Sequence, residues 1–169
     1  MELRTERLIL RKARLDDLAE VNAFMGHAGA MQYWSTPPHA DLERTRAWLQ
    51  AHIEADPEIS LNYLIEFEGR VIGEVGSFPI PEFGFILHPD YWGRGIGLEA
   101  GRAVIDHLFA TRPVDSLVAD VDPRNTSSIA LLVKLGFLKT GEARATLCIG
   151  GEWVDSEYYG LKRPPGAPS

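Results

Sequence analysis

Hydrophobic and polar residues alternate with two different periods along this chain of 169 residues. Apolar positions in residues 18–25 have the spacing of one helical face, and the same spacing recurs in residues 42–53 and 98–111. Residues 61–67 and 71–77 instead alternate from one face to the other, which is typical of a β-hairpin. The pattern therefore predicts three helices and an antiparallel pair of strands.

Shorter apolar runs, bounded by turn residues, predict the remaining elements. A short helix is expected at residues 127–135, and strands are expected at residues 3–11, 83–87, 117–121 and 137–145, with a final hairpin at residues 147–161 that turns at Gly150-Gly151. No repeat or internal linker interrupts this order. It indicates a mixed α/β domain built around one sheet.

The composition is that of one ordinary domain. We expect the domain to cover residues 1–162, because residues 163–169 contain three prolines and no apolar periodicity, and we expect these last residues to form a flexible tail. The charged N-terminus lacks the apolar stretch of a signal peptide, and no run of 18 apolar residues predicts a membrane span. Cys148 is the only cysteine, which excludes a disulfide framework. A cytoplasmic protein without a membrane partner is expected.

The net charge favours one kind of partner over another. Seventeen basic residues against 24 acidic residues give a net charge of −7. This charge repels a phosphate backbone, so it argues against nucleic acid as a partner. It favours a cationic, amine-bearing partner.

A glycine-rich segment, Trp92 to Gly97, precedes the helix predicted at residues 98–111. Its three glycines remove side chains where a ligand approaches the backbone, and they free the amide N–H groups of residues 94–98 to point together. The helix dipole and Arg94 add positive charge there, so the segment suits a pyrophosphate. The alternative is a plain loop that needs glycines for its turns. Leu98-Glu99, which follows Gly97, does not match a nucleoside triphosphate loop.

Residues 95–100 also satisfy the dinucleotide-binding pattern, with Asp115 and Asp120 at a plausible distance for a ribose contact. In a dinucleotide fold the first glycine directly follows its strand, whereas here residues 88–92 intervene. The preceding strand also follows a hairpin instead of starting a series of parallel strands. This context argues against a nicotinamide or flavin oxidoreductase, which stays open as an alternative.

Several motifs in this order resemble the GNAT N-acetyltransferases, and in particular their Rim-type branch. The signature loop matches at Trp92 to Gly97, with Trp92 in place of the usual Gln or Arg. The similarity extends over nearly the whole chain, through Leu3-x-Thr5-x-Arg7-Leu8-x-Leu10-Arg11, Glu82-Phe83-Gly84-Phe85, Glu99-Ala100, Asn125-x-x-Ser128, Lys134-Leu135-Gly136-Phe137, Gly151-x-Trp153-x-Asp155 and Tyr159-x-Leu161.

The resemblance implies a fold and a reaction. The fold is a single mixed, mostly antiparallel sheet of six to seven strands flanked by about four helices. The reaction moves an acetyl group from acetyl-CoA to a primary amine by direct attack in a ternary complex. The residues implied to bind the cosubstrate are Phe85, Ile86, Leu87, Trp92, Gly93, Arg94, Gly95, Ile96, Gly97, Leu98, Asn125, Ser128 and Lys134. Asn125 is equally suited to cap the helix that follows it.

The chemistry requires a group that takes a proton from the amine, since amines are protonated at neutral pH. Glu82 matches a glutamate position of the Rim-type branch, and Glu74 is a second candidate within its strand. Each can instead be an ordinary strand charge. The leaving thiolate benefits from a proton donor. Many GNAT members use a tyrosine that aligns here with Leu132, so Ser128 is the remaining candidate, unless its hydroxyl only belongs to the capping turn.

The sequence marks the acceptor pocket less clearly than the cosubstrate site. Tyr33, Trp34, Trp153 and Asp155 are candidate walls of the acceptor pocket, because aromatic rings and carboxylates suit an aliphatic or terminal amine. The acceptor can be a protein N-terminus or a small molecule, and the enzyme a monomer or a homodimer. No metal-ligand spacing occurs among the histidines. Because the tyrosine acid is missing, a CoA-binding regulator without catalysis is a further alternative.

Overall fold

The first half of the chain forms a five-stranded antiparallel sheet in the computed structural model, which describes residues 2–149 and 151–165. The strands follow one another across the sheet in chain order. They are β1 (Glu2–Arg4), β2 (Leu8–Arg11), β3 (Leu61–Phe67), β4 (Arg70–Ser77) and β5 (Phe83–Leu87). Each strand contributes alternate residues to the two faces of the sheet, so both faces need cover.

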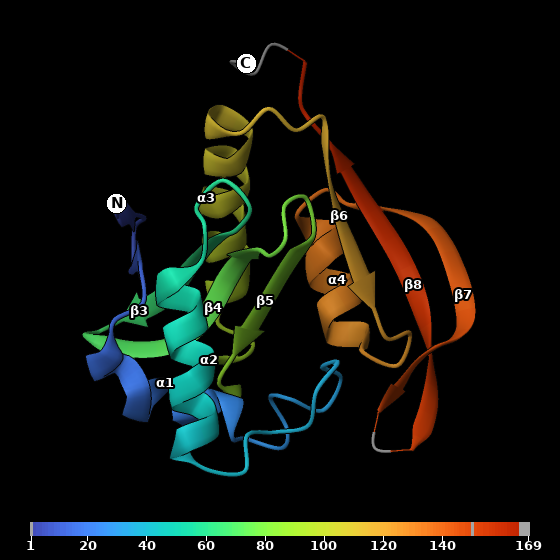
Figure 1. The fold of residues 1–169 in the computed structure, drawn as a ribbon. Helices are drawn as coiled ribbons and strands as arrows, with labels where there is room; N and C mark the ends of the chain where they lie inside the picture. Colours follow the sequence, from blue (N-terminus) through green and yellow to red (C-terminus); the bar gives the residue numbers. More distant parts are fainter. Residues whose placement is uncertain (1, 150, 166–169) are drawn as a thin grey trace.

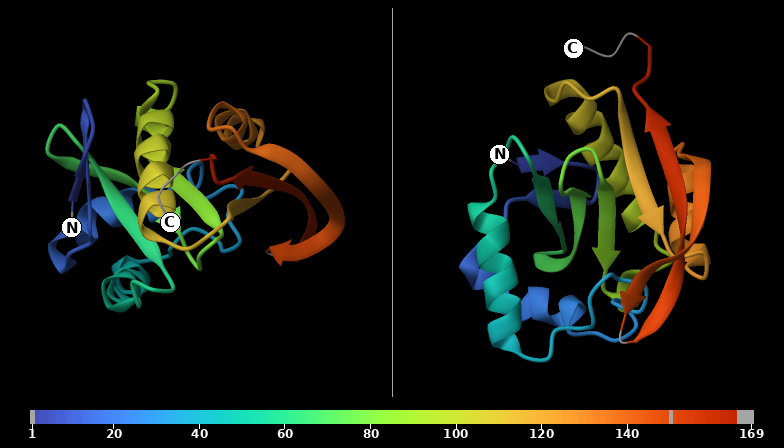
Figure 2. Two further views of the ribbon diagram at one scale, coloured as in Figure 1. Left: turned by 90° about the horizontal axis from the view of Figure 1, so that it is seen from above. Right: turned by 45° about the vertical axis from the view of Figure 1, so that its right-hand side comes forward.

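Helices cover both faces of this sheet (Figures 1 and 2). On one face lie the short 3₁₀ turn η1 (Leu15–Asp17), α1 (Leu18–Met25) and α2 (Leu42–Glu54), where Phe24 and Leu49 pack in one cluster with Leu64. On the other face lies α3 (Ile96–Thr111), which follows the 3₁₀ turn η2 (Pro89–Tyr91). The buried residues of each helix recur at helical spacing, as the sequence predicts.

A second sheet holds the strands of the C-terminal half. Its order is β6-β8-β7, with β6 (Ser116–Val121), β7 (Leu138–Ile149) and β8 (Glu152–Lys162), and α4 (Thr126–Lys134) lies between β6 and β7 in the chain (Figure 1). The mixed α/β fold class is confirmed. The single sheet of six to seven strands is corrected to described sheets of five and three strands.

The two sheets meet at one parallel bridge between Glu82 and Val118. The amide N–H of Val118 also donates to the carbonyl oxygen of Pro81 at 3.0 Å. No further pairing joins β5 and β6 within the described residues, because a cavity separates them beyond this point. The lost pairing is the reason that one expected sheet becomes two.

The segment predicted as one strand at residues 3–11 is instead a tight antiparallel pair. Leu3 lies opposite Leu10, and the chain reverses at residues 5–7. The turn is held by Thr5, whose amide donates to the Leu8 carbonyl and whose Oγ1 accepts from the Leu8 amide, each at 3.0 Å. Its side chain therefore offers a local alternative to an extended strand.

One residue beyond the last strand still contacts the domain. Arg163 donates from its amide to Asp115 O at 2.8 Å and from Nε to Val114 O at 2.9 Å, and the domain end at residue 162 stays a prediction. Gly150 of the expected turn and residues 166–169 of the expected tail lie outside the described residues. In the part that the structure describes, no helix is long and apolar enough to cross a membrane.

Phe137 should be essential for stability. It is fully buried and stacks on Phe83 at 5.5 Å between ring centroids, so it packs the entry of β7 against β5. Truncation to alanine leaves a cavity, and Phe137→Ala should lower the free energy of unfolding by about 3–5 kcal/mol in urea titrations. Leu138→Ala is the matched control, because Leu138 is 73% exposed and its loss should cost no more than about 0.5 kcal/mol. Equal losses for both variants would contradict this packing.

Candidate active site

A cavity of about 240 Å³ opens between β5 and β6 beyond their bridge. Its walls come from the α1–α2 connection, the start of β5, the end of β6, α4 and the β7–β8 hairpin. It brings together the predicted site residues Tyr33, Trp34, Glu82, Phe85, Asn125, Ser128 and Asp155. Residues from distant parts of the chain thus meet at the line where the two sheets separate.

Carboxylates dominate the polar lining of this cavity. Arg124 neutralises Asp122 at 2.7 Å, and its hydrogen bonds hold the pKa of Asp122 below its usual value. Asp155 accepts from the amide of Ala145 at 2.9 Å and so supports the irregular pairing of β7 with β8. Neither Glu82 nor Asp120 has a hydrogen-bonding or ionic partner for its carboxylate among the described residues. These two carboxylates remain available to a ligand.

Asp120 lines the cavity, whereas the sequence indicates it only as a possible ribose contact. The signal was present in the alternation of β6, where Leu117, Ala119 and Val121 are buried and Asp120 faces the opposite way. The alternation does not show which element faces Asp120, because β5 is brought beside β6 only by the fold.

Arg124 ties together the rim of the cavity. Its guanidinium binds Asp122 and, at 3.0 Å, Glu152 of the β7–β8 hairpin. The same group lies 5.8 Å from the centre of the Tyr33 ring, which belongs to the α1–α2 connection. Three segments that are distant in sequence are therefore joined at this rim by one cation.

The glycine segment lies at the far end of β5, at the start of α3. Gly93 and Gly95 have φ angles of +72° and +75°, a left-handed conformation that favours glycine. Gly97 also lies against α4: a Cβ there would lie 2.9 Å from Leu131 Cδ2, so the small size of glycine suits this contact between α3 and α4. The helix also begins at Ile96, two residues before the predicted start.

The backbone of this segment presents a row of unused donors. The amide N–H groups of residues 93–98 have no acceptor within the described part of the chain, whereas Glu99 N returns to Gly95 O at 3.0 Å. Arg94 adds a full positive charge and lies over the Tyr91 ring at 5.4 Å. Trp92 does not face this row, because its Nε1 donates to the Leu87 carbonyl at 2.8 Å. The arrangement is suited to a phosphate-bearing anion.

Helix α4 contributes a capped start to the cavity wall. Asn125 Oδ1 accepts from the amide of Ser128 at 3.2 Å, which is the capping role considered from the sequence. Both residues also line the cavity, so the cap leaves their remaining polar groups beside it. Leu132 lines the same wall and is buried, and it supplies no proton donor.

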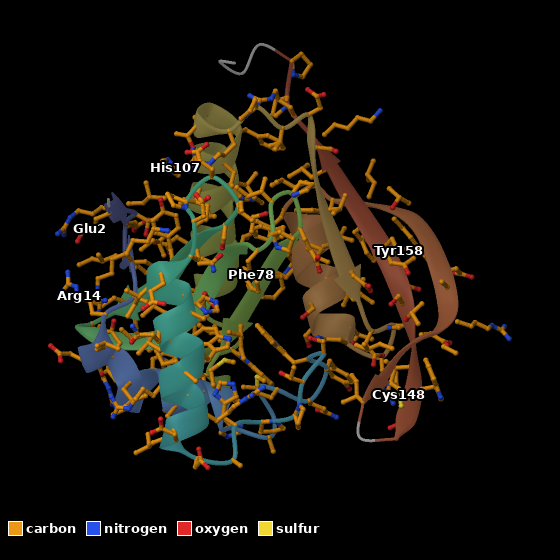
Figure 3. The ribbon with its side chains drawn as sticks, in the orientation of Figure 1. Glu2, Arg14, Phe78, His107, Cys148 and Tyr158 are labelled. Carbon is orange, nitrogen blue, oxygen red and sulfur yellow. The ribbon has the colours of Figure 1, made fainter. Side chains whose placement is uncertain are left out.

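The other predicted site residues do not line the cavity. Ile86 is buried under α1 and α2, Lys134 is exposed at the end of α4, and Trp153 is 64% exposed on β8. Glu74 is buried on the α2 side, where its Oε1 lies 3.2 Å from His52 Nε2. His52 in turn contacts Phe78, whose position is marked in Figure 3 and whose side chain lines the cavity.

Strand β5 connects the two parts of the site. Its start lines a cavity with free carboxylates, and its end meets a turn of backbone donors at a helix N-terminus. No cluster in the described chain has the ligands for a metal ion. Cys148, the lone thiol, is exposed on β7 (Figure 3). Fold and site thus put a carboxylate-lined cavity and a segment suited to a phosphate-bearing anion at the two ends of one strand.

Comparison with known proteins identifies the family. Residues 7–138 match the family described as the acetyltransferase (GNAT) domain, and the chain therefore belongs to the GNAT acetyltransferases. An uncharacterized N-acetyltransferase, p20, from Bacillus licheniformis is 30% identical over 168 residues, which cover 94% of each chain. Spermidine N(1)-acetyltransferase from Escherichia coli (strain K12) is 27% identical over 171 residues, with 93% and 91% covered.

Solved structures agree on the fold. The RimL ribosomal L7/L12 α-N-protein acetyltransferase in complex with coenzyme A superposes with a TM-score of 0.87 at 20% identity, covering 96% of this chain and 98% of that chain. The similarity to the Rim-type branch is thereby confirmed at the level of the fold. The chain is an acetyl-CoA-dependent N-acetyltransferase that acts on an amine, and nothing supports the oxidoreductase or the regulator without catalysis.

The pair of His52 and Glu74 predicts a pH dependence of stability. Burial lowers the pKa of His52, but the hydrogen bond and charge of Glu74 outweigh burial, so the net pKa is raised above 6.5. The folded state then binds the proton more tightly than the unfolded state, and the stabilisation is complete below pH 6.5 and is lost as pH rises through the folded pKa. The difference in unfolding free energy between wild type and His52→Gln should shrink from pH 6 to pH 9. A constant difference would show that no proton is held there.

Proposed function

We propose that this enzyme acetylates a cationic primary amine, either a peptide N-terminus or a small-molecule amine, that enters between Tyr33 and the carboxylates of Glu82 and Asp120. The observation that carries the proposal is the pair of unpartnered carboxylates in an aromatic-walled cavity. An ammonium group entering there meets negative charge and ring faces, both of which stabilise a cation. The net charge of −7 also attracts such a molecule.

The placement of acetyl-CoA follows from the donor row. Its pyrophosphate is assigned to the amides of residues 93–98 and to Arg94, and its pantetheine arm to the unpaired edge of β5 beside Phe85. Asn125 and Ser128 lie on the opposite wall and offer further hydrogen bonds to the arm. The thioester then reaches the cavity that holds the amine. The cavity is not lined by four of the residues that the resemblance implies for acetyl-CoA, namely Ile86, Leu87, Trp92 and Lys134. Any contribution that we assign to them comes from their positions in the chain around the proposed site.

We assign the two proton transfers of the reaction to Glu82 and Ser128. Glu82 takes a proton from the bound ammonium, directly or through water, so that the neutral nitrogen attacks the thioester carbonyl carbon. A C–N bond forms, the C–S bond breaks, and the CoA thiolate leaves. The attacking nitrogen loses its second proton as the amide forms. Ser128 passes a proton to the thiolate, directly or through water, and regains one from that nitrogen. Glu74 is assigned a supporting role, because His52 and Phe78 stand between it and the amine.

The names of two relatives indicate the class of acceptor. One is named for spermidine and the other for the N-terminus of a ribosomal protein, and both of these acceptors are amines. Such acceptors agree with a cytoplasmic enzyme. They are compatible with a monomer and with a homodimer. We assign Trp153 and Asp155 of β8 to the acceptor entrance, where Asp155 shapes the hairpin through its bond to the Ala145 amide.

Glu82 is expected to control turnover. Removing its charge in Glu82→Gln should lower kcat about a hundredfold at pH 7.5, since general base catalysis contributes about that much, while the KM for acetyl-CoA stays constant. The measurement is release of CoA thiol with spermidine or an alanine-initiated peptide as acceptor. Glu43→Gln on α2 is the matched control, because Glu43 is 85% exposed and pairs only loosely with Arg46. Unchanged turnover in Glu82→Gln would remove Glu82 from the chemistry.

Asp120 is expected to control affinity for the amine. Asp120→Asn should raise the acceptor KM about tenfold with little change in kcat, because it removes an attraction made equally in the ground state and transition state. A panel of spermidine, monoamines and short peptides shows which acceptor loses most. If Asp120→Asn left the acceptor KM unchanged for every amine of the panel, the acceptor would bind elsewhere. Absence of thiol release with every amine would overturn the proposed acceptor class itself.

A further inference from the structure

We infer that Arg7 is a positioning residue for acetyl-CoA. Arg7 forms a clamp with Glu99, and through this clamp it orients the backbone of the glycine segment at residues 92–97. The inference rests on the proposed placement of the CoA pyrophosphate. It concerns the turn between β1 and β2, which the sequence reading noted only as part of a family resemblance. In the structure this turn lies against the first turn of α3.

Glu99 is the centre of the contact. Its Oε1 accepts from the amide of Arg7 at 2.9 Å and from Thr5 Oγ1 at 2.5 Å, and its Oε2 accepts from Arg7 Nε at 2.7 Å. Burial raises the pKa of Glu99, but these hydrogen bonds and the charge of Arg7 outweigh it, so the net pKa is lowered. A carboxylate beside a phosphate site would repel the ligand if its charge were free. The clamp neutralises that charge and holds it on the side of the N-terminal turn.

The second contact of Arg7 sets the direction of a peptide group. Arg7 Nη1 donates to the carbonyl oxygen of Arg94 at 3.0 Å. In a trans peptide the carbonyl of one residue and the amide N–H of the next point in opposite directions. Holding the Arg94 carbonyl toward Arg7 therefore turns the Gly95 N–H away from it, toward the open side of the segment.

The amide of Leu98 is also free beside this contact. Gly95 is the N-cap of α3, so the Leu98 amide is one of the donors that a helix N-terminus leaves without a partner. Glu99 N to Gly95 O is the first helical bond in the described structure. Arg7 Nη2 would lie 3.5 Å from a Cβ added at Gly95, so the guanidinium lies against this left-handed residue as well as against the Arg94 carbonyl.

The clamp should act on donor binding and not on the chemical step. Arg7→Ala should raise the dissociation constant of CoA and the KM for acetyl-CoA about tenfold, with kcat and the amine KM unchanged. Arg7→Lys keeps the charge but cannot reach Glu99 and Arg94 together, so it should restore only part of the affinity. Arg4→Ala is the matched control, because Arg4 lies in the same hairpin, is 70% exposed and has Glu2 as its one ionic partner among the described residues.

A truncated donor separates positioning from general damage to the fold. S-Acetylpantetheine lacks the pyrophosphate, so wild type and Arg7→Ala should use it equally well. Glu99→Gln, which removes the charge of the clamp and keeps its shape, gives a second measurement if Arg7→Ala folds poorly, and it should also weaken CoA and spare S-acetylpantetheine. Equal CoA affinity in wild type and both variants, or equal losses with both donors, would overturn the inference. Failure of wild type to bind CoA at all would instead overturn the proposed donor site.

Discussion

The parting of β5 from β6 governs the rest of this structure. One bridge, Glu82 to Val118, is the β-pairing between the two sheets in the described chain. Beyond this bridge the backbone edges of β5 and β6 do not pair with each other. Unpaired strand edges inside a protein need partners. Here the opening is lined by side chains from α4, from the α1–α2 connection and from the β7–β8 hairpin. A gap that would be a defect in a continuous sheet thus becomes a site for an extended ligand.

Charge pairing separates the structural carboxylates from those that face a ligand. Asp122 is paired with Arg124 and Glu99 with Arg7, so both charges are compensated, and Asp155 accepts a hydrogen bond from a backbone amide. Glu82 and Asp120 lack such partners within the described chain. In an acidic protein this distinction is more informative than the count of acidic residues, because only an uncompensated carboxylate attracts an ammonium strongly.

Local patterns predicted the elements better than their arrangement. The faces of α1 and α3 follow from residues three and four apart, and the loop before α3 follows from glycines whose positive φ angles other residues avoid. The reversal at residues 5–7 was missed because Thr5 holds it through its side chain, which an apolar pattern does not register. The closeness of Gly97 to Leu131 was not predicted, because the two residues are 34 positions apart in the chain.

By itself the sequence determined the family and the mixed α/β class, and it indicated a phosphate-binding segment at residues 92–97, since each motif and each periodic pattern consists of residues close together in the chain. Only the tertiary structure decided which carboxylates share the cavity, that Glu74 lies behind His52, and that Arg7 and Glu99 meet. These are contacts between residues about 20 to 90 positions apart. They depend on how β5 and β6 separate and how the β1–β2 turn meets α3, and a pattern with a period of two or 3.6 residues contains no information about such distances.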